Sequence, residues 1–343
     1  MPADLRPASR HKILLDADVG IDDAIAMLFL AGRPDAELVG VGSVHGNIPS
    51  ELAAANARRL LELCGLDDVP VAIGARRPMA QPLATAEWVH GADGLGNTNR
   101  PAPKRGPVAE DAVAQMLRLT REAPGEIDIV AVGPLTNLGL ALCIDPSLAQ
   151  RVRSVTVMGG TIIHEGNASA TGEANIWHDP EAAQLVFSAP WKATMVGLDV
   201  TQVTRLRAAE LAEIEGLGTR RSRFAIEILA HYLGVYQRTF GARECPLHDP
   251  LAAGVSLDPS YIVEALRLAI DVSLAGANRG QTVVDRRSWM APATNDAERR
   301  ERVGGDVGAP KDAAAAPALV TIPMKVDGPR FVKDLIETLR VGG

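Results

Sequence analysis

The chain has few of the features that assign a protein to a membrane, export or nucleic-acid class. No apolar run approaches the roughly 20 residues that are needed to cross a bilayer. Residues 1–12 lack the apolar core of a signal peptide. The 35 basic residues are outnumbered by 42 acidic ones, and this net charge of -7 argues against a nucleic-acid-binding surface. We therefore expect a cytoplasmic protein with no membrane partner and no nucleic-acid partner.

Cysteine is also scarce. The three cysteines, Cys64, Cys143 and Cys245, are far apart in the sequence and form no CxxC pair. An odd number of scattered cysteines is typical of reduced side chains in the cytosol, where disulfides are rare. The sequence therefore predicts neither a disulfide framework nor a cysteine-based zinc or redox site.

What the chain does contain is enough apolar sequence for a large core. Of its 343 residues, 47% are hydrophobic and 22% are charged, which is typical of a globular protein. Strand-like apolar runs alternate with longer helix-like runs, and this alternation predicts an α/β fold with a mainly parallel central sheet flanked by helices. No repeat or linker divides the chain. We expect a single domain over residues 12–343, with a flexible surface insertion at 291–317, where apolar periodicity is absent.

The expected elements follow from the apolar patterns. Strands are predicted at 13–15, 38–44, 69–73, 127–132, 152–158, 193–198, 269–274, 282–284 and 318–322. Helices are predicted from Ala24 onward, at 51–63, 108–122, 134–143 and 180–188, within 208–240, from His248 onward, and at 328–339. Long polar loops are predicted at 75–107 and 161–176. Loops of this length in a compact domain are commonly functional.

The stretch 13–30, ILLDADVGIDDAIAMLFL, brings four aspartates to the end of a strand: Asp16, Asp18, Asp22 and Asp23. Like charges this close raise one another's pKa or bind a hard cation such as Ca²⁺ or Mg²⁺, which prefers carboxylate oxygens. Capping of the following helix explains Asp22 and Asp23. It does not explain Asp16 and Asp18, which lie where open α/β sheets bind ligands. We therefore expect a metal or polyol site here.

Further polar groups lie in loops or directly after predicted strands. They are His45, Gly46 and Asn47; His90; Glu165, Asn167, Glu173 and Asn175; and His248 with Asp249. Taken alone, each has an ordinary explanation as a turn residue, a solvated loop side chain or a helix cap. Together they offer carboxylate, amide and imidazole groups, which suit a polyol bound beside a hard cation and its hydrolysis by an activated water.

Nine short motifs resemble those of one family. They are DADVGIDDA at 16–24, GN at 46–47, HGADGLG at 90–96, VGPLTN at 132–137, VMGG at 157–160, HEGN at 164–167, GEANI at 172–176, DPEAA at 179–183 and HDP at 248–250. In this order and at these separations, they are similar to the calcium-dependent nucleoside hydrolases of the inosine-uridine-preferring type. The resemblance runs from about Lys12 to Val284 and resumes at the carboxyl-terminal strand and helix.

The resemblance implies a fold and a cofactor. It implies one α/β domain with its site at the carboxyl ends of the strands, assembled as a homodimer or homotetramer. It further implies that Ca²⁺ is bound by the carboxylates of Asp18, Asp23 and Asp249 and by the backbone carbonyl of Val132. Only the main-chain oxygen of Val132 is used, so its apolar side chain is no obstacle. Asp16 would support this cluster from behind.

The resemblance also implies how a ribonucleoside substrate is held. Asp22 and Asn175 would contact the 2′ and 3′ hydroxyls of the ribose. Asn167 and Glu173 would contact the 5′ side. Asn47 would lie near them.

The implied reaction hydrolyses the N-glycosidic bond to free nucleobase and ribose, in nucleoside salvage. Asp18 would deprotonate the metal-bound water, and His248 would be the acid for the departing base, with His90 as a helper. Positive charge develops at the anomeric carbon, and the surrounding carboxylates stabilise it. Purine and pyrimidine substrates both stay open, because residues 241–243, GAR, stand where some members place larger apolar groups.

Other interpretations fit less of the sequence. Phosphatases of the haloacid-dehalogenase type also place DxD after their first strand, but they do not account for the HEGN, GEAN and HDP motifs. An EF-hand loop would need a glycine at Ile21 and a glutamate at Met27. A Ca²⁺-assisted nucleoside or ribose binding protein without turnover is the alternative to an enzyme. Asp18 and His248 favour the enzyme.

Overall fold

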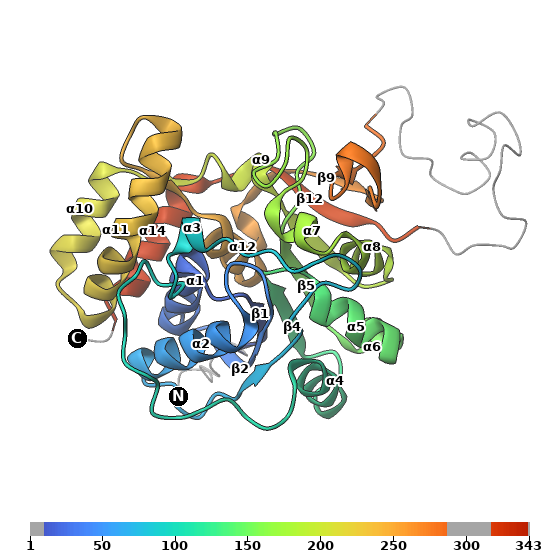
Figure 1. Ribbon diagram of the computed structural model, residues 1–343, viewed down its shortest axis with the longest axis horizontal. Helices are drawn as coiled ribbons and strands as arrows, with labels where there is room; N and C mark the ends of the chain where they lie inside the picture. The colour runs from blue at the N-terminus through green and yellow to red at the C-terminus, as the bar shows by residue number, and fades with distance from the viewer. Residues whose placement is uncertain (1–9, 287–316, 342–343) are drawn as a thin grey trace, which may run out of the picture.

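The computed structural model describes residues 10–286 and 317–341. The strands of its main sheet are β1 (His11–Ala17), β2 (Ala36–Ser43), β3 (Val71–Ile73), β4 (Ile127–Ala131), β5 (Ser154–Met158), β6 (Ala193–Val196), β9 (Ile262–Leu268) and β12 (Val320–Val326). They form an eight-stranded sheet in the order β3-β2-β1-β4-β5-β6-β12-β9. β9 runs antiparallel to β12, and the other neighbours are parallel. The predicted mainly parallel sheet is confirmed (Figure 1).

Helices cover both faces of this sheet (Figure 1). The longer ones are α1 (Ile21–Gly32), α2 (Ser50–Cys64), α4 (Ala112–Glu122), α5 (Thr136–Ile144), α8 (Pro180–Ser188), α10 (Ala208–Leu217), α11 (Arg220–Phe240), α12 (His248–Leu257) and α14 (Gly328–Leu339). Ile13 and Leu15 of β1 pack in the core with α1, α12 and α14, whereas Leu14 packs with α4 and α5 on the other face. The alternation of side chains along a strand therefore builds two apolar layers.

Short elements lie in the connections. They are α3 (Glu87–His90), α6 (Leu148–Arg151), α7 (Ala174–His178), α9 (Leu198–Thr201), β7 (Arg205–Leu206), β8 (Cys245–Pro246), β10 (Asp271–Val272) and β11 (Thr282–Val283). The sequence predicted only loop over α3 and over the start of α7. These helices have 4 and 5 residues, too few to show an apolar period.

The region after α12 differs most from the sequence prediction. The strand predicted at 269–274 is reduced to β10, and the longer strand is β9, just before it. Residues 263–267 of β9 are exposed and include Glu264 and Arg267, so this edge strand lacks the apolar run of a buried strand. Helix α4 begins at Ala112 because Asp111 caps it. The insertion predicted at 291–317 lies outside the described residues, except for its last one.

One point at the carboxyl edge of the sheet is favoured for ligand binding by the strand order. β1 pairs with β2 on one side and with β4 on the other. The chain runs outward from β1 through β2 to β3, and then returns to β4 on the opposite side of β1. Helices α1 and α5, which follow β1 and β4, therefore lie on opposite faces of the sheet. A change of direction of this kind leaves a crevice outside the strand ends, where open α/β sheets bind ligands.

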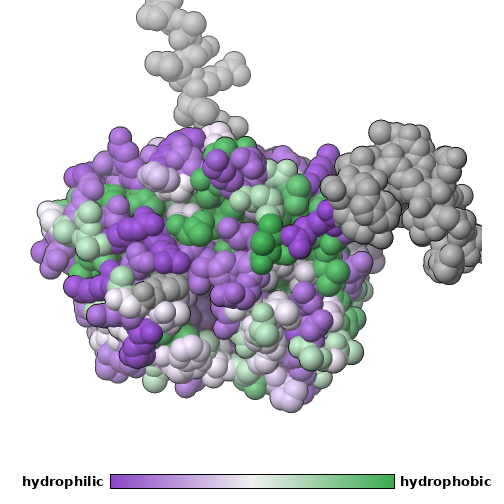
Figure 2. Space-filling view, turned by 90° about the horizontal axis from the view of Figure 1, so that it is seen from above, coloured by the Kyte–Doolittle hydropathy of each residue, from purple (hydrophilic) through white to green (hydrophobic). Residues whose placement is uncertain are grey.

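The surface offers less guidance than the sheet. None of the helices in the described part of the chain combines the length and apolar character that a bilayer crossing requires. The face seen from above mixes hydrophilic and hydrophobic residues (Figure 2). The surface pattern does not single out a binding face, so we look for the candidate site among the buried polar groups at the strand ends.

Candidate active site

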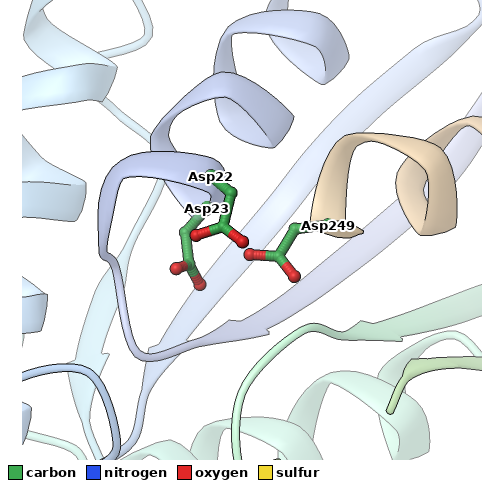
Figure 3. A group of neighbouring side chains, drawn as sticks. All are labelled: Asp22, Asp23 and Asp249. Atoms are coloured by element: carbon green, nitrogen blue, oxygen red, sulfur yellow. The ribbon is translucent and has the colours of Figure 1, made fainter. Parts of the chain in front are cut away.

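Three aspartates from two distant segments meet at the carboxyl edge of the sheet. Asp22 and Asp23 lie in the first turn of α1, and Asp249 lies in the first turn of α12. One carboxylate oxygen from each lies within 4.8 Å of the others. All three side chains are buried and point toward one another (Figure 3). Since α1 packs along α12, the helix pair fixes this convergence.

Hydrogen bonds within the chain use only one carboxylate oxygen each of Asp18 and Asp23. Asp23 Oδ2 accepts the Gly20 N–H at 2.8 Å, and Asp18 Oδ2 accepts the Asn47 N–H at 2.6 Å. Their other oxygens, Asp18 Oδ1 and Asp23 Oδ1, are buried without a hydrogen-bond partner, and so is Asp22 Oδ1. Buried polar atoms normally have partners. Hard oxygen donors gathered in this way are the ligands that Ca²⁺ or Mg²⁺ prefers, so the cluster can hold a metal ion.

The raised pKa values of the clustered aspartates also favour a bound cation. Burial raises the pKa of Asp23 to about 7, and the neighbouring Asp22 carboxylate adds to this effect. Burial raises the pKa of Asp18 and of Asp249 well above the ordinary value, again with contributions from the other aspartates. A cation among the carboxylates would oppose these shifts, because it favours their charged forms.

Val132 and Asn175 lie where β4 and β5 end. The Asn175 Nδ2 group donates to the Val132 carbonyl at 2.9 Å and to the Met158 carbonyl at 3.1 Å. A carbonyl oxygen has two lone pairs, so the Val132 oxygen keeps one for a further ligand. The predicted metal set included Val132 and Asp18, whereas the closest group of carboxylates contains Asp22. Asp18 contacts the same group through Asp23.

The expected ribose contacts come from the loop before α7 and from the turn after β2. Glu173 caps α7 and accepts N–H groups from Gly160 and Asn175, and burial raises its pKa to about 7. Asn167 is exposed, and its Oδ1 accepts the Ala174 N–H at 2.8 Å. Asn47 Nδ2 donates to Asp23 Oδ2 at 3.1 Å.

The turn after β2 has to be built on a glycine. A Cβ atom at Gly46, which has a φ of 154°, would lie 2.1 Å from Asp18 Oδ2. The backbone of Asn47 reaches the Asp18 carboxylate because this space stays empty.

His248 is buried at the start of α12 and lies in a chain of hydrogen-bonding groups. Its Nδ1 lies 2.8 Å from Thr201 Oγ1, and its Nε2 lies 3.2 Å from the Tyr236 hydroxyl. The Tyr232 hydroxyl, 3.5 Å from that of Tyr236, donates to Asp22 Oδ2 at 3.2 Å. Burial lowers the pKa of His248 to about 4. Sequence reasoning missed Thr201 and Tyr232, although the spacing of Tyr232 and Tyr236 does place both on one helix face.

His90 is buried and not a solvated loop residue. Its Nδ1 accepts the Ile21 N–H at 3.1 Å and lies 3.7 Å from Asp22 Oδ1. Burial lowers the pKa of His90 to about 3, so the ring is neutral and carries its proton on Nε2. The structure thus brings His90 to the cluster beside Asp22.

Two other polar residues singled out in the sequence lie behind the cluster. Asp16 Oδ1 accepts from Asn137 Nδ2 at 2.7 Å, and burial raises the pKa of Asp16 to about 7. His45 Nε2 lies 2.9 Å from Thr136 Oγ1, which donates to Asp179. These bonds tie the ends of β1 and β2 to the start of α5. A separate depression of 340 Å³ beside α10 and α14 contains none of the site residues.

Comparisons with known proteins identify the family of the chain. The sequence profile described as inosine-uridine preferring nucleoside hydrolase matches residues 13–333. The chain is 35% identical over 280 residues to the inosine-uridine preferring nucleoside hydrolase of Crithidia fasciculata, covering 81% of this chain and 88% of that one.

Solved structures are similar over the whole described fold. A plant nucleoside hydrolase superposes with a TM-score of 0.87 at 30% identity, covering 96% of this chain and 99% of that one. A purine-preferring ribonucleoside hydrolase from Gardnerella vaginalis has a TM-score of 0.83 at 28% identity and covers 96% of this chain and 98% of its own. On the profile and on these identities, the chain belongs to the inosine-uridine preferring nucleoside hydrolase family.

Proposed function

We propose that this protein hydrolyses the N-glycosidic bond of ribonucleosides, giving free nucleobase and ribose, with a water activated at a Ca²⁺ site. The observation that carries the proposal is the group of buried carboxylate oxygens without partners, on Asp18, Asp22 and Asp23, next to Asp249. A structural cluster of acids would satisfy these atoms from within the chain. A ligand that supplies positive charge and hydroxyl groups satisfies them from outside.

The donor set favours Ca²⁺. The carboxylates of Asp18, Asp23 and Asp249 and the second lone pair of the Val132 carbonyl would hold it, and all of these are hard oxygen ligands. The absence of histidine nitrogen and cysteine sulfur from this set argues against zinc. When bound, such a cation neutralises the carboxylates and lowers the pKa of a water molecule that it binds.

Asp18 is the group best placed to take the proton of the attacking water. Its Oδ2 is fixed by the Asn47 N–H, and its Oδ1 is buried without a partner. A general base works best when it lies within hydrogen-bond reach of the proton and is held in one orientation. Fixing one oxygen through the backbone leaves the other oriented for this transfer.

The ribose would be held by groups whose bonding is only partly used. Asp22 Oδ1 has no partner and is assigned to a 2′ or 3′ hydroxyl, beside Asn175. Asn167 and Glu173 are assigned to the 5′ side, with Asn47 nearby. Carboxylates around the sugar stabilise the positive charge that develops at the anomeric carbon as the bond to the base breaks.

The departing nucleobase gains negative charge and needs a hydrogen-bond donor. His248 is assigned to this role, and Tyr236 and Thr201 hold its two ring nitrogens. His90 presents its Nε2–H as a second donor, since Nδ1 is already bonded to the backbone. Two donors of this kind suit either a purine or a pyrimidine base. The relatives named above include both inosine-uridine preferring and purine-preferring enzymes.

Release of reducing ribose tests the proposal. Purified protein is incubated with inosine, adenosine, guanosine, uridine and cytidine, with Ca²⁺ and with a chelator. Chelator-sensitive ribose release is expected from at least one nucleoside. If folded, Ca²⁺-loaded protein binds a nucleoside but releases no ribose, the non-catalytic binding protein is the correct alternative.

The remaining assignments are further parts of the proposal. We place the reaction in nucleoside salvage in the cytoplasm, and we expect a homodimer or homotetramer. Light scattering of the purified protein measures the number of subunits. A monomeric mass would contradict the expected assembly without affecting the proposed reaction.

A further inference from the structure

The loop between β5 and α7 is fastened to the fold at its first residues. Thr161 N–H donates to Thr282 Oγ1 at 3.0 Å, and the Thr282 hydroxyl donates to the Thr161 carbonyl at 2.6 Å. The next residues of the loop contact Asp199, a half-buried residue of the four-residue helix α9. The loop then runs on to Asn167 and Glu173, the residues assigned to the 5′ side of the ribose.

The Asp199 carboxylate binds three consecutive backbone N–H groups. Its Oδ2 accepts from Ile162 at 2.8 Å, and its Oδ1 accepts from Ile163 at 2.7 Å and from His164 at 3.0 Å. Hydrogen bonds to a charged carboxylate are stronger than those between neutral groups. Three of them in succession fix both the position and the direction of the segment 162–164.

The rest of the loop is held mainly by its own bonds. Gly166 N–H donates to the Ala170 carbonyl, and the N–H groups of Ala168 and Ser169 donate to the Gly172 carbonyl. Asn167 Oδ1 accepts the Ala174 N–H, which leaves the amide NH₂ group to face a ligand. An NH₂ donor matches the lone pairs of a hydroxyl oxygen. The position of this compact turn therefore depends on its fastenings at 161–164 and on the start of α7, where Ala174 is bonded to Asn167.

Helix α9 also reaches the group assigned to the nucleobase. Thr201, two residues after Asp199, lies 2.8 Å from His248 Nδ1 through its Oγ1. The N–H of Leu198 donates to the Gly160 carbonyl at 2.9 Å, so α9 is joined to the start of the same loop. One short turn thus contacts the backbone of the loop that carries Asn167, through Asp199, and a group on the base side, through Thr201.

We propose that Asp199 is a positioning residue that holds the 161–167 segment over the site, so that Asn167 can bind the 5′ hydroxyl. This inference rests on the proposed function, because it takes the ribose contacts from there. Its consequence is a preference for substrates that carry a free 5′ hydroxyl, and this preference depends on a carboxylate that does not itself touch the substrate.

The test compares Asp199→Ala with the wild type on two substrates. These are the ribonucleoside that the wild type hydrolyses best and the 5′-deoxy form of the same nucleoside. Asp199→Ala should raise KM about tenfold for the natural nucleoside, as expected for the loss of one well-placed hydrogen bond, with kcat within about twofold. It should leave KM for the 5′-deoxy substrate unchanged. Asp199→Asn keeps one accepting oxygen and should give an intermediate value.

Two further variants separate positioning from general stability. Asp145 also accepts a backbone N–H, from Ser147, and binds Arg121 and Arg151 away from the site. Asp145→Asn should lower Tm and leave KM for both substrates unchanged. Thr201→Val should lower kcat with little change in KM, whereas Asp199→Ala should raise KM with little change in kcat.

Several outcomes would overturn the inference. An equal rise in KM for both substrates, or no rise for either, would show that Asp199 does not act through the 5′ hydroxyl. Hydrogen exchange of peptides covering 161–167 gives a readout that needs no turnover. These amides should exchange faster in Asp199→Ala, and unchanged exchange would refute the anchoring itself. A wild type that hydrolyses no nucleoside would instead count against the proposed function, and the exchange result would still decide the anchoring.

Discussion

The two ends of the central sheet treat buried aspartates in opposite ways. At the amino end, Asp128 of β4 binds Arg153 through both of its oxygens, and it also accepts from Ser154 Oγ at 2.6 Å. At the carboxyl end, Asp18 and Asp23 each keep one buried oxygen without a partner. The same residue type is fully satisfied at one end of the sheet and left open beyond the strands at the other end.

The pKa shifts follow this difference. Burial by itself would raise the pKa of Asp128, but hydrogen bonds from Arg153 and Ser154 outweigh it and lower the pKa. At the carboxyl end, burial and neighbouring carboxylates act together and raise the pKa of Asp23 to about 7. A carboxylate paired with a cation inside the chain stabilises the fold. A carboxylate left unpaired is available to a ligand, at a cost to the stability of the empty protein.

The largest effect is expected from Asp18→Asn. An amide cannot accept the proton of the attacking water, so kcat should fall about 10³-fold, within the range for loss of a general base. Ribose release measures it. Without Ca²⁺ the Tm should not fall, because the change removes a buried charge and keeps the side-chain shape. A variant that retains more than a tenth of wild-type kcat would show that Asp18 is not the base.

Removal of the cation is expected to lower stability through the aspartates at the carboxyl end of the sheet and not through Asp128 at the amino end. Ca²⁺ at 100 times its Kd should add about 2.7 kcal/mol to the free energy of unfolding, because it binds the folded state alone. Thermal unfolding with and without a chelator measures this difference. Asp23→Asn should abolish the response, whereas Asp128→Asn should keep it. A chelator that leaves the wild-type Tm unchanged would contradict the metal site.

At the amino end, Arg153→Met should destabilise the fold without altering catalysis. It leaves the buried Asp128 carboxylate without its main partner and should cost about 2 kcal/mol of unfolding free energy, measured by urea denaturation. Lys12→Met is the matched control, since Lys12 pairs with Glu126 on the surface of the same end and should cost less than Arg153→Met. A fall in kcat for Arg153→Met would contradict the proposal that the amino end of the sheet affects stability and not catalysis.

The smallest effect is expected from pH. Because the folded-state pKa of Asp128 is lowered, its stabilising contribution is complete above its unfolded pKa of about 3.9 and is lost as the pH falls through the folded value. The stability of the wild type should therefore fall more steeply than that of Asp128→Asn below about pH 4. Urea midpoints measured between pH 3 and pH 6 compare the two. Parallel curves would mean that the Arg153 pair does not lower this pKa.

Much of the fold was predictable because its signals are local. The apolar runs of β1, β2, β4, β5 and β6 and the helices between them are visible in the sequence as periodic patterns. β9 was missed because an exposed edge strand with Glu264 and Arg267 has no such run. The predicted start of α1 at Ala24 was late. Ile21 begins the helix instead, and this places Asp22 and Asp23 in its first turn.

The candidate site was only partly predictable. Asp16, Asp18, Asp22 and Asp23 share one short stretch, so their charge crowding could be inferred directly. Thr201 gave no local signal, and the helical spacing of Tyr232 and Tyr236 did not reveal their partners, because Tyr232 and Thr201 each act on a group far away in the chain. Tyr232 reaches Asp22 across 210 positions, and Thr201 reaches His248 across 47.

The sequence by itself determined the alternation of strands and helices and the acidic stretch at the end of β1, because each depends on residue type and near neighbours. Tertiary structure alone decided which carboxylate oxygens stay unpaired, that Asp22 joins Asp23 and Asp249 in one group, and that Asp199 holds the loop of Asn167. These depend on how α1, α9 and α12 pack at the strand ends. The burial of a side chain and its hydrogen-bond partners depend on residues from distant parts of the chain, which come together only when the chain folds.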